Sequence, residues 1–114
     1  MDLSPIVKSS AGLDVHSKMI VVTLLQEQED GNIKETVKEF STFPEQLTLL
    51  ASWLKSEAVE LVVLESTGVY WKGVFEALET HAINAYVVNA RMVKQIPGKK
   101  TDISDSKWLA TLAR

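Results

Sequence analysis

The sequence predicts an α/β domain in which helices flank a mixed five-stranded sheet. Three observations lead to this fold class: a strand-rich start without helical periodicity, an Asp-Gly hairpin signal at 30–31, and a later alternation of apolar strands with amphipathic helices. The chain has 114 residues, of which 46% are hydrophobic and 24% charged, so it can bury a single core and is too apolar for a disordered segment. We therefore expect one domain over residues 1–114.

The first part of the chain predicts three antiparallel strands. Residues 9–17 and 18–28 are rich in the Val, Leu and Ile side chains that strands favour. The stretch "EDGN" at 29–32 carries the hairpin signal and leads to a third strand at 33–42, where Ile33, Val37 and Phe40 stand among charged residues. These strands should form a meander at the start of the sheet.

The remainder predicts helices that alternate with buried strands. Residues 41–57 carry Thr42 and Glu45 at capping-box spacing, Pro44 in the first turn and apolar residues along one helical face. Short apolar runs at 59–67 and 83–90 predict strands buried on both faces, with a helix between them at about 70–80. Two more helices are expected at about 90–96 and 102–114, separated by Pro97 and Gly98.

This element order is that of the ribonuclease H-like fold: strands 1 to 3 antiparallel, then parallel crossover units. A flavodoxin-like domain would need helices between its first strands, and the first forty residues predict none.

Composition excludes several classes of protein. No cysteine is present, which excludes disulfides and thiolate metal sites and fits a reducing compartment. The longest apolar run, 19–25, is too short to span a bilayer, and the first ten residues lack an apolar signal segment, so we expect a cytoplasmic protein with no membrane partner. The net charge of −3 argues against a very basic nucleic-acid binder, although Arg91, Lys94, Lys99, Lys100 and Lys107 form a local basic stretch.

Four carboxylates stand where a chemical reason is needed. Asp14 interrupts the apolar stretch "GLDV" and Glu65 ends "LVVLE", and a buried carboxylate is unfavourable unless it is paired, hydrogen-bonded or bound to metal. Asp102 and Asp105 share one face of the first turn of the last predicted helix. If the first strand is central and the fourth lies beside it, the two strand ends can meet. Such oxygen ligands suit Mg²⁺ or Mn²⁺, and two ions about 4 Å apart support phosphodiester chemistry of the nuclease or transposase kind.

Each of these carboxylates also has a purely structural interpretation. Asp102 and Asp105 can be a helix N-cap and its N3 partner, Asp14 can end a strand in a turn, and Glu65 can cap the helix that follows.

Further residues near these acids keep two interpretations open. Ser66, Thr67 and Gly68 can offer N–H groups to a phosphate or cap a helix, and the Tyr70 and Trp71 rings can stack on a base or pack in the core. Lys99 and Lys100, with Arg91 and Lys94, can contact phosphates or only be solvated, and His16 should share the strand face of Asp14.

Three blocks of sequence resemble one family. The stretches "GLDVHSK", "ESTGVYW" and "VVNARMVKQIPGKKTDISDSKWLA" occur in order and span roughly residues 10 to 114. They resemble the N-terminal domain of the DEDD transposases, the insertion-sequence-110-type recombinases that include pilin-gene inversion proteins. The resemblance implies a RuvC-like domain whose Asp-Glu-Asp-Asp tetrad binds Mg²⁺ or Mn²⁺ for DNA strand cleavage and rejoining. By motif, the tetrad falls on Asp14, Glu65, Asp102 and Asp105, and Ser106 stands where the family usually has Ala.

The resemblance also implies a longer protein. Family members continue through a coiled coil into a second domain with a serine nucleophile, so we expect a fragment that does not suffice for the full reaction. DNA is the implied partner, and the full-length protein is expected to be a homo-oligomer and to bind a guide RNA.

Three rival functions remain at this point. A RuvC-like nuclease would use the same acids, and a degenerate domain would bind nucleic acid or protein while the acids only cap and solvate. An actin-like sugar kinase would need a Gly-rich turn after Asp14, where "DVHSKM" has no glycine.

Overall fold

The computed structural model describes residues 8–66, 68–89, 106–107 and 110–111. Its elements are β1 (Ser9–Val15), β2 (Met19–Glu27), β3 (Ile33–Ser41), α1 (Pro44–Ser56), β4 (Leu61–Ser66), α2 (Trp71–Thr80) and β5 (Ala85–Asn89). Residues 106–107 and 110–111 are helical. The helix expected at about 90–96 lies outside the described residues.

The strands form one five-stranded sheet in the order β3-β2-β1-β4-β5. β1 pairs antiparallel with β2, and β2 with β3, whereas β1 pairs parallel with β4, and β4 with β5. The mixed sheet, the opening meander and the central position of the first strand are confirmed. The sheet therefore brings β1 and β4, which carry Asp14 and Glu65, into direct contact.

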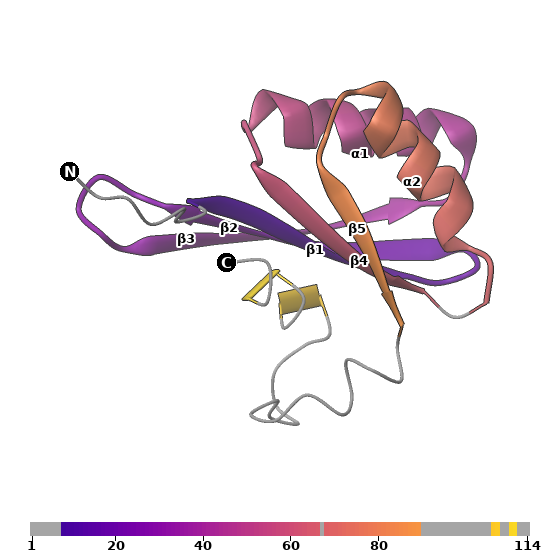
Figure 1. Cartoon of the computed structure of the whole chain (residues 1–114), viewed down its shortest axis with the longest axis horizontal. Coiled ribbons are helices and arrows are strands. Elements are labelled where there is room, and N and C mark those ends of the chain that lie inside the picture. The colour runs from indigo at the N-terminus through magenta and orange to yellow at the C-terminus, as the bar shows by residue number, and fades with distance from the viewer. Residues whose placement is uncertain (1–7, 67, 90–105, 108–109, 112–114) are drawn as a thin grey trace.

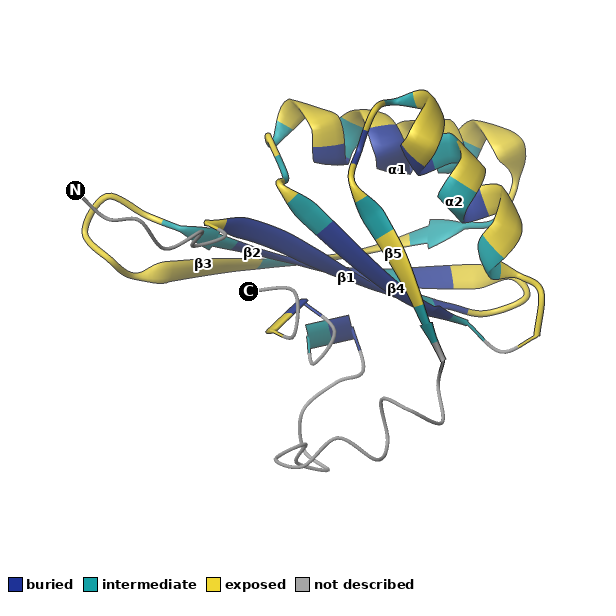
Figure 2. Cartoon of the chain, in the orientation of Figure 1, coloured by how far each residue is buried: buried dark blue, intermediate teal, exposed yellow. Residues whose placement is uncertain are grey.

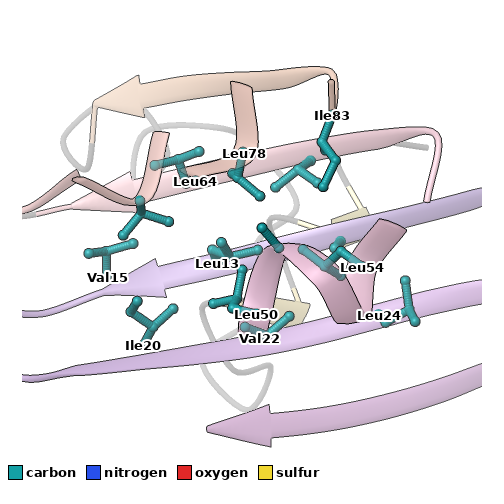
Figure 3. Close-up of a cluster of buried hydrophobic side chains, with 14 residues drawn as sticks. Leu13, Val15, Ile20, Val22, Leu24, Leu50, Leu54, Leu64, Leu78 and Ile83 are labelled. Atoms are coloured by element: carbon teal, nitrogen blue, oxygen red, sulfur yellow. The ribbon is translucent and has the colours of Figure 1, made fainter. Parts of the chain in front are cut away.

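Helices α1 and α2 lie together on one face of this sheet (Figure 1). Alternate strand residues point at them, because successive side chains of a strand point to opposite faces. Leu13 of β1, Val22 of β2 and Leu64 of β4 are fully buried between sheet and helices, together with Leu50 and Leu78 from the helices (Figure 3). This apolar layer covers one face of the sheet. The opposite face, called the outer face below, carries Asp14, Thr23 and Glu65.

The β2–β3 hairpin closes as the Asp-Gly signal predicts. Gly31 adopts a φ of +85°, in the left-handed region that favours glycine. The Asn32 backbone N–H donates to Oδ1 of Asp30 and its amide to Oδ2, each at 2.9 Å. The backbone hydrogen bond, followed by that from the side chain, lowers the pKa of Asp30.

The capping box predicted for α1 is wrong. The residue before the helix is Phe43, it makes no side-chain cap, and Pro44 is the first helical residue. The Thr42 hydroxyl instead donates to the carbonyl of Ser17 at 3.0 Å, in the turn between β1 and β2. Pro44 lies at the helix start, as predicted. Proline is favoured there because the N–H that it lacks would have no hydrogen-bond partner within the helix.

The outer face of the sheet carries the C-terminal segment. The helical residues 106–107 and 110–111 lie on the opposite side of the sheet from α1 and α2 (Figures 1 and 2), and the rest of the helix expected at 102–114 lies outside the described residues. Among the residues described, no helix is long and apolar enough to cross a membrane.

Candidate active site

Asp14 and Glu65 lie side by side on the outer face. They are direct partners in the parallel pairing of β1 with β4, so their Cα atoms lie on adjacent strands about 4.8 Å apart. Their neighbours Leu13 and Leu64 are buried against the helices, so both carboxylates point the other way. The Asp14 side chain is 17% exposed and Glu65 is 6% exposed. Two acids from segments far apart in the sequence thus meet at the carboxyl ends of two parallel strands.

His16 lies beside Asp14, as expected from two residues that are two positions apart and share one face of a strand. Its Nε2 is 3.2 Å from Oδ2 of Asp14, and its own side chain is 51% exposed. The His16 backbone N–H donates to the carbonyl of Met19 at 2.9 Å, which closes the β1–β2 turn. The imidazole therefore contacts one carboxylate oxygen of Asp14, Oδ2.

The connection from β4 to α2 corrects one expectation. Helix α2 begins after Tyr70, which makes no side-chain cap, so neither Glu65 nor Ser66 caps it. Gly68 has a φ of +66°, and a Cβ atom added there would meet nothing within 4 Å, so glycine is favoured by backbone conformation and not by space. Glu65 is therefore not the N-cap residue of α2, which is Tyr70.

The sequence left two roles open for the Tyr70 and Trp71 rings, stacking on a base and packing in the core, and the structure differs between the two residues. Trp71 packs against the core and meets Phe75 edge to face, with 6.0 Å between ring centroids. Tyr70 is 48% exposed, next to the exposed Val69 in the loop that follows Glu65. Trp71 is a core residue, whereas Tyr70 faces solvent at the end of the sheet where the carboxylates lie.

Described residues of the C-terminal segment contact the sheet through polar groups. The hydroxyls of Ser106 and Thr23 are 2.6 Å apart in a buried contact, and the Ser10 hydroxyl donates to the carbonyl of Ala110 at 2.8 Å. At the surface, Nζ of Lys107 is 3.1 Å from Oε1 of Glu35 on β3. These contacts link residues that are far apart in the sequence and hold the segment directly on the sheet.

The contacts also give the direction of this segment. Thr23 is the β2 partner of Gly12, so Ser106 lies at the level of Gly12, whereas Ala110 lies at the level of Ser10. From 106 to 110 the segment therefore moves back along β1, away from Asp14.

The remaining predicted site residues lie outside the described residues. They are Asp102, Asp105, Arg91, Lys94, Lys99 and Lys100. Within the described part of the chain, no group of three or more His, Cys, Asp or Glu side chains is close enough to hold a metal ion. Of the predicted tetrad, the described residues supply the pair Asp14 and Glu65.

Sequence reasoning did not single out Thr23 and Ser10, although a signal was present. Both are polar residues inside strands and both are fully buried. A buried hydroxyl within an apolar run such as "IVVTLL" indicates a polar partner from elsewhere in the chain. The sequence alone does not reveal which residue that partner is.

Several solved structures share this fold. RuvC of Thermus thermophilus in complex with a Holliday junction substrate matches with a TM-score of 0.61 at 11% identity, over 90% of this chain and 90% of that chain. The fowlpox virus resolvase in complex with Holliday junction DNA matches at 0.53 and 13% identity, over 82% of this chain and 65% of that one. A Ppx/GppA family member of Aquifex aeolicus matches at 0.53 and 11% identity, over 77% and 37% of the two chains.

The domain has a RuvC-like, ribonuclease H-like fold. The chain belongs to the DEDD transposase family of the insertion-sequence-110 type, whose family model, described as transposase, matches residues 11–114. The predicted family and fold are thereby confirmed, and the domain is one of a DNA-recombining enzyme. No curated protein matches the sequence significantly.

Proposed function

We propose that this domain is the metal-dependent catalytic domain of a transposase that cleaves and rejoins DNA strands of an insertion sequence. Asp14, Glu65, Asp102 and Asp105 bind Mg²⁺ or Mn²⁺. The observation that carries the proposal is the in-register pairing of Asp14 with Glu65 on the outer face of the sheet.

The donor set fits a hard divalent cation. Both described acids are oxygen donors, and no thiolate is available in the sequence. Two carboxylates on adjacent strands, one of them 6% exposed, repel each other, and a cation between them would remove that repulsion. The chemistry that bound Mg²⁺ supplies is activation of an attacking oxygen and stabilisation of the leaving oxygen of a phosphodiester.

The direction of the C-terminal segment supports the other two acids as ligands. From Ala110 back to Ser106 the chain approaches the end of β1 that carries Asp14. Asp105 directly precedes Ser106 in the sequence, and Asp102 stands three residues earlier, a spacing typical of residues on one helical face. We therefore propose that these two acids complete the ligand set.

The chain's own residues prepare the site in three ways. His16 orients Asp14, the β1–β4 pairing fixes the spacing of the two carboxylates, and the apolar layer beneath them keeps water from one side. The exposed Tyr70 ring lies at the same end of the sheet, where it can stack on a base of a DNA strand. The RuvC and fowlpox virus structures, which hold junction DNA on the same fold, favour DNA as the partner. Arg91, Lys94, Lys99 and Lys100 are proposed to contact its phosphates.

A metal titration tests the proposal. The melting temperature of the chain is followed while Mn²⁺ is added, because an ion that binds only the folded state stabilises it by about 2.7 kcal/mol at one hundred times its Kd. We expect a rise in the wild type and none in Asp14→Asn. Glu76→Gln, which removes an exposed acid on α2, is the control and should respond like the wild type.

Two results would contradict the proposal: no rise in the wild type at millimolar Mn²⁺, or the same rise in Asp14→Asn. Either would favour a domain that binds nucleic acid while its acids have only structural roles.

A further inference from the structure

The buried contact between Thr23 and Ser106 lies next to the proposed metal site without being part of it. We propose that these two residues form a positioning pair, which sets the register of the C-terminal segment on the sheet and so positions Asp105 for the metal ion. This inference rests on the proposed function. It assigns a role to two hydroxyls that bind neither metal nor DNA themselves.

The contact has the geometry of a strong and specific hydrogen bond. The two oxygens are 2.6 Å apart, at the short end of the range for hydroxyl pairs, and the residues are 0% and 1% exposed. A buried hydroxyl without a partner is unfavourable, so a segment shifted along the sheet would bury two unsatisfied groups. The pair therefore favours one register over its neighbours more strongly than apolar contacts alone would.

A second anchor fixes the angle of the segment. The Ser10 hydroxyl donates to the carbonyl of Ala110, one helical turn beyond Ser106, and both residues are fully buried. One point of attachment would leave a helix free to swing, whereas two points on neighbouring strands define a line. The ion pair of Lys107 with Glu35 is largely exposed and contributes little to this alignment.

Register matters here because Asp105 is bonded to Ser106. A shift by one residue moves a helix by about 1.5 Å and turns its side chains by about 100°. Metal ligands must be held to within about 0.5 Å of their productive positions. If Asp105 is a ligand as proposed, a slip of the segment would weaken metal binding.

The family resemblance leads one to expect Ala at position 106, where this chain has Ser106. The Ser106 hydroxyl is the partner of the buried Thr23 hydroxyl. An Ala there would leave the Thr23 hydroxyl buried and unpaired. A Val at position 23 together with Ala at 106 would restore a match of apolar shapes. Removing both partners is expected to be milder than removing one, since no hydroxyl is then left without a partner.

The experiment measures the Kd for Mn²⁺ of the intact chain, by electron paramagnetic resonance of the free ion, at a temperature where every variant is folded by circular dichroism. We expect Thr23→Val and Ser106→Ala each to raise the Kd about five- to tenfold, on the scale of one lost hydrogen bond. Thr23→Ser, which keeps the hydroxyl, should retain the wild-type Kd. The double variant Thr23→Val/Ser106→Ala should lie closer to the wild type than either single variant.

A purely structural role would lower the melting temperature of the single variants and leave the Kd of the folded protein unchanged. That result overturns the positioning role while the proposed function stands. Absence of Mn²⁺ binding in the wild type instead overturns the proposed function and this inference with it.

If the single variants do not fold, a disulfide cross-link between positions 23 and 106 tests the proposal instead. The chain has no cysteine, so Thr23→Cys/Ser106→Cys introduces the sole thiol pair, at positions whose hydroxyl oxygens lie 2.6 Å apart. We expect the oxidised protein to be cross-linked within one chain and to bind Mn²⁺ with the wild-type Kd. Cross-linking with loss of Mn²⁺ binding, or no cross-link in folded protein, overturns the inference.

Discussion

Replacement of Glu65 by Gln should stabilise the protein without metal and destabilise it, relative to the wild type, in saturating Mn²⁺. The change keeps the shape of the side chain and removes one of two negative charges that face each other across β1 and β4. Without a cation the two charges repel, so their removal favours folding. With a cation the same charge is a ligand, so its removal eliminates the gain that binding supplies.

The size of the effect follows from the spacing of the strands. Two unit charges about 5 Å apart repel by about 3 kcal/mol at an effective dielectric constant of about 20. The neighbouring His16 and the partial exposure of Asp14 reduce this, so we expect the free energy of unfolding to rise by about 1 to 2 kcal/mol. For a domain of this size that corresponds to an increase in melting temperature of about 4 °C or more.

The assay is thermal unfolding of wild type and Glu65→Gln, each with chelator and with Mn²⁺ near one hundred times the wild-type Kd. The wild type should gain about 2.7 kcal/mol from the ion and overtake the variant. A variant that is less stable than the wild type in chelator would refute the reasoning. It would show that existing contacts hold the Glu65 carboxylate favourably without metal.

Two further predictions concern residues outside the metal site. In an NMR titration the Asp30 carboxyl should have a pKa below its ordinary value, and Asn32→Ala should raise that pKa toward the ordinary value. The hydrogen bonds to the charged carboxylate stabilise the hairpin at a pH above the ordinary pKa, and this stabilisation is lost as the pH falls through the lowered pKa. Trp71→Ala should lower the free energy of unfolding in urea by about 2 kcal/mol and Tyr70→Ala by less than about 1 kcal/mol, because Trp71 packs on the core and Tyr70 is exposed. Equal losses for the two ring deletions would contradict this division.

The fold was predictable from local patterns because each pattern acts over a few residues. The Asp-Gly turn, the apolar runs of β4 and β5 and Pro44 each specify an element without help from elsewhere. The central position of β1 followed from the order of these elements, and the meeting of Asp14 with Glu65 followed from that position.

What could not be predicted depends on contacts between distant segments. Thr42 has the residue type and the spacing of a capping box, but its hydroxyl donates to Ser17 in a turn that lies 25 positions earlier in the chain. The pairing of Thr23 with Ser106 joins residues 83 positions apart. A single sequence shows that each hydroxyl lies in an apolar or helical context, and it carries no information on which distant group will be opposite.

The alternation along β4 makes the strand intolerant of a one-residue change in length. Leu64 belongs to the apolar layer and Glu65 to the outer face, and they are neighbours in one strand with a repeat of two. Deleting a residue before them would turn the carboxylate into the hydrocarbon layer and the leucine toward the solvent. Insertions and deletions of single residues should therefore be confined to the turns at either end of this strand, and a loss of metal binding should accompany a loss of folding when they fall inside it.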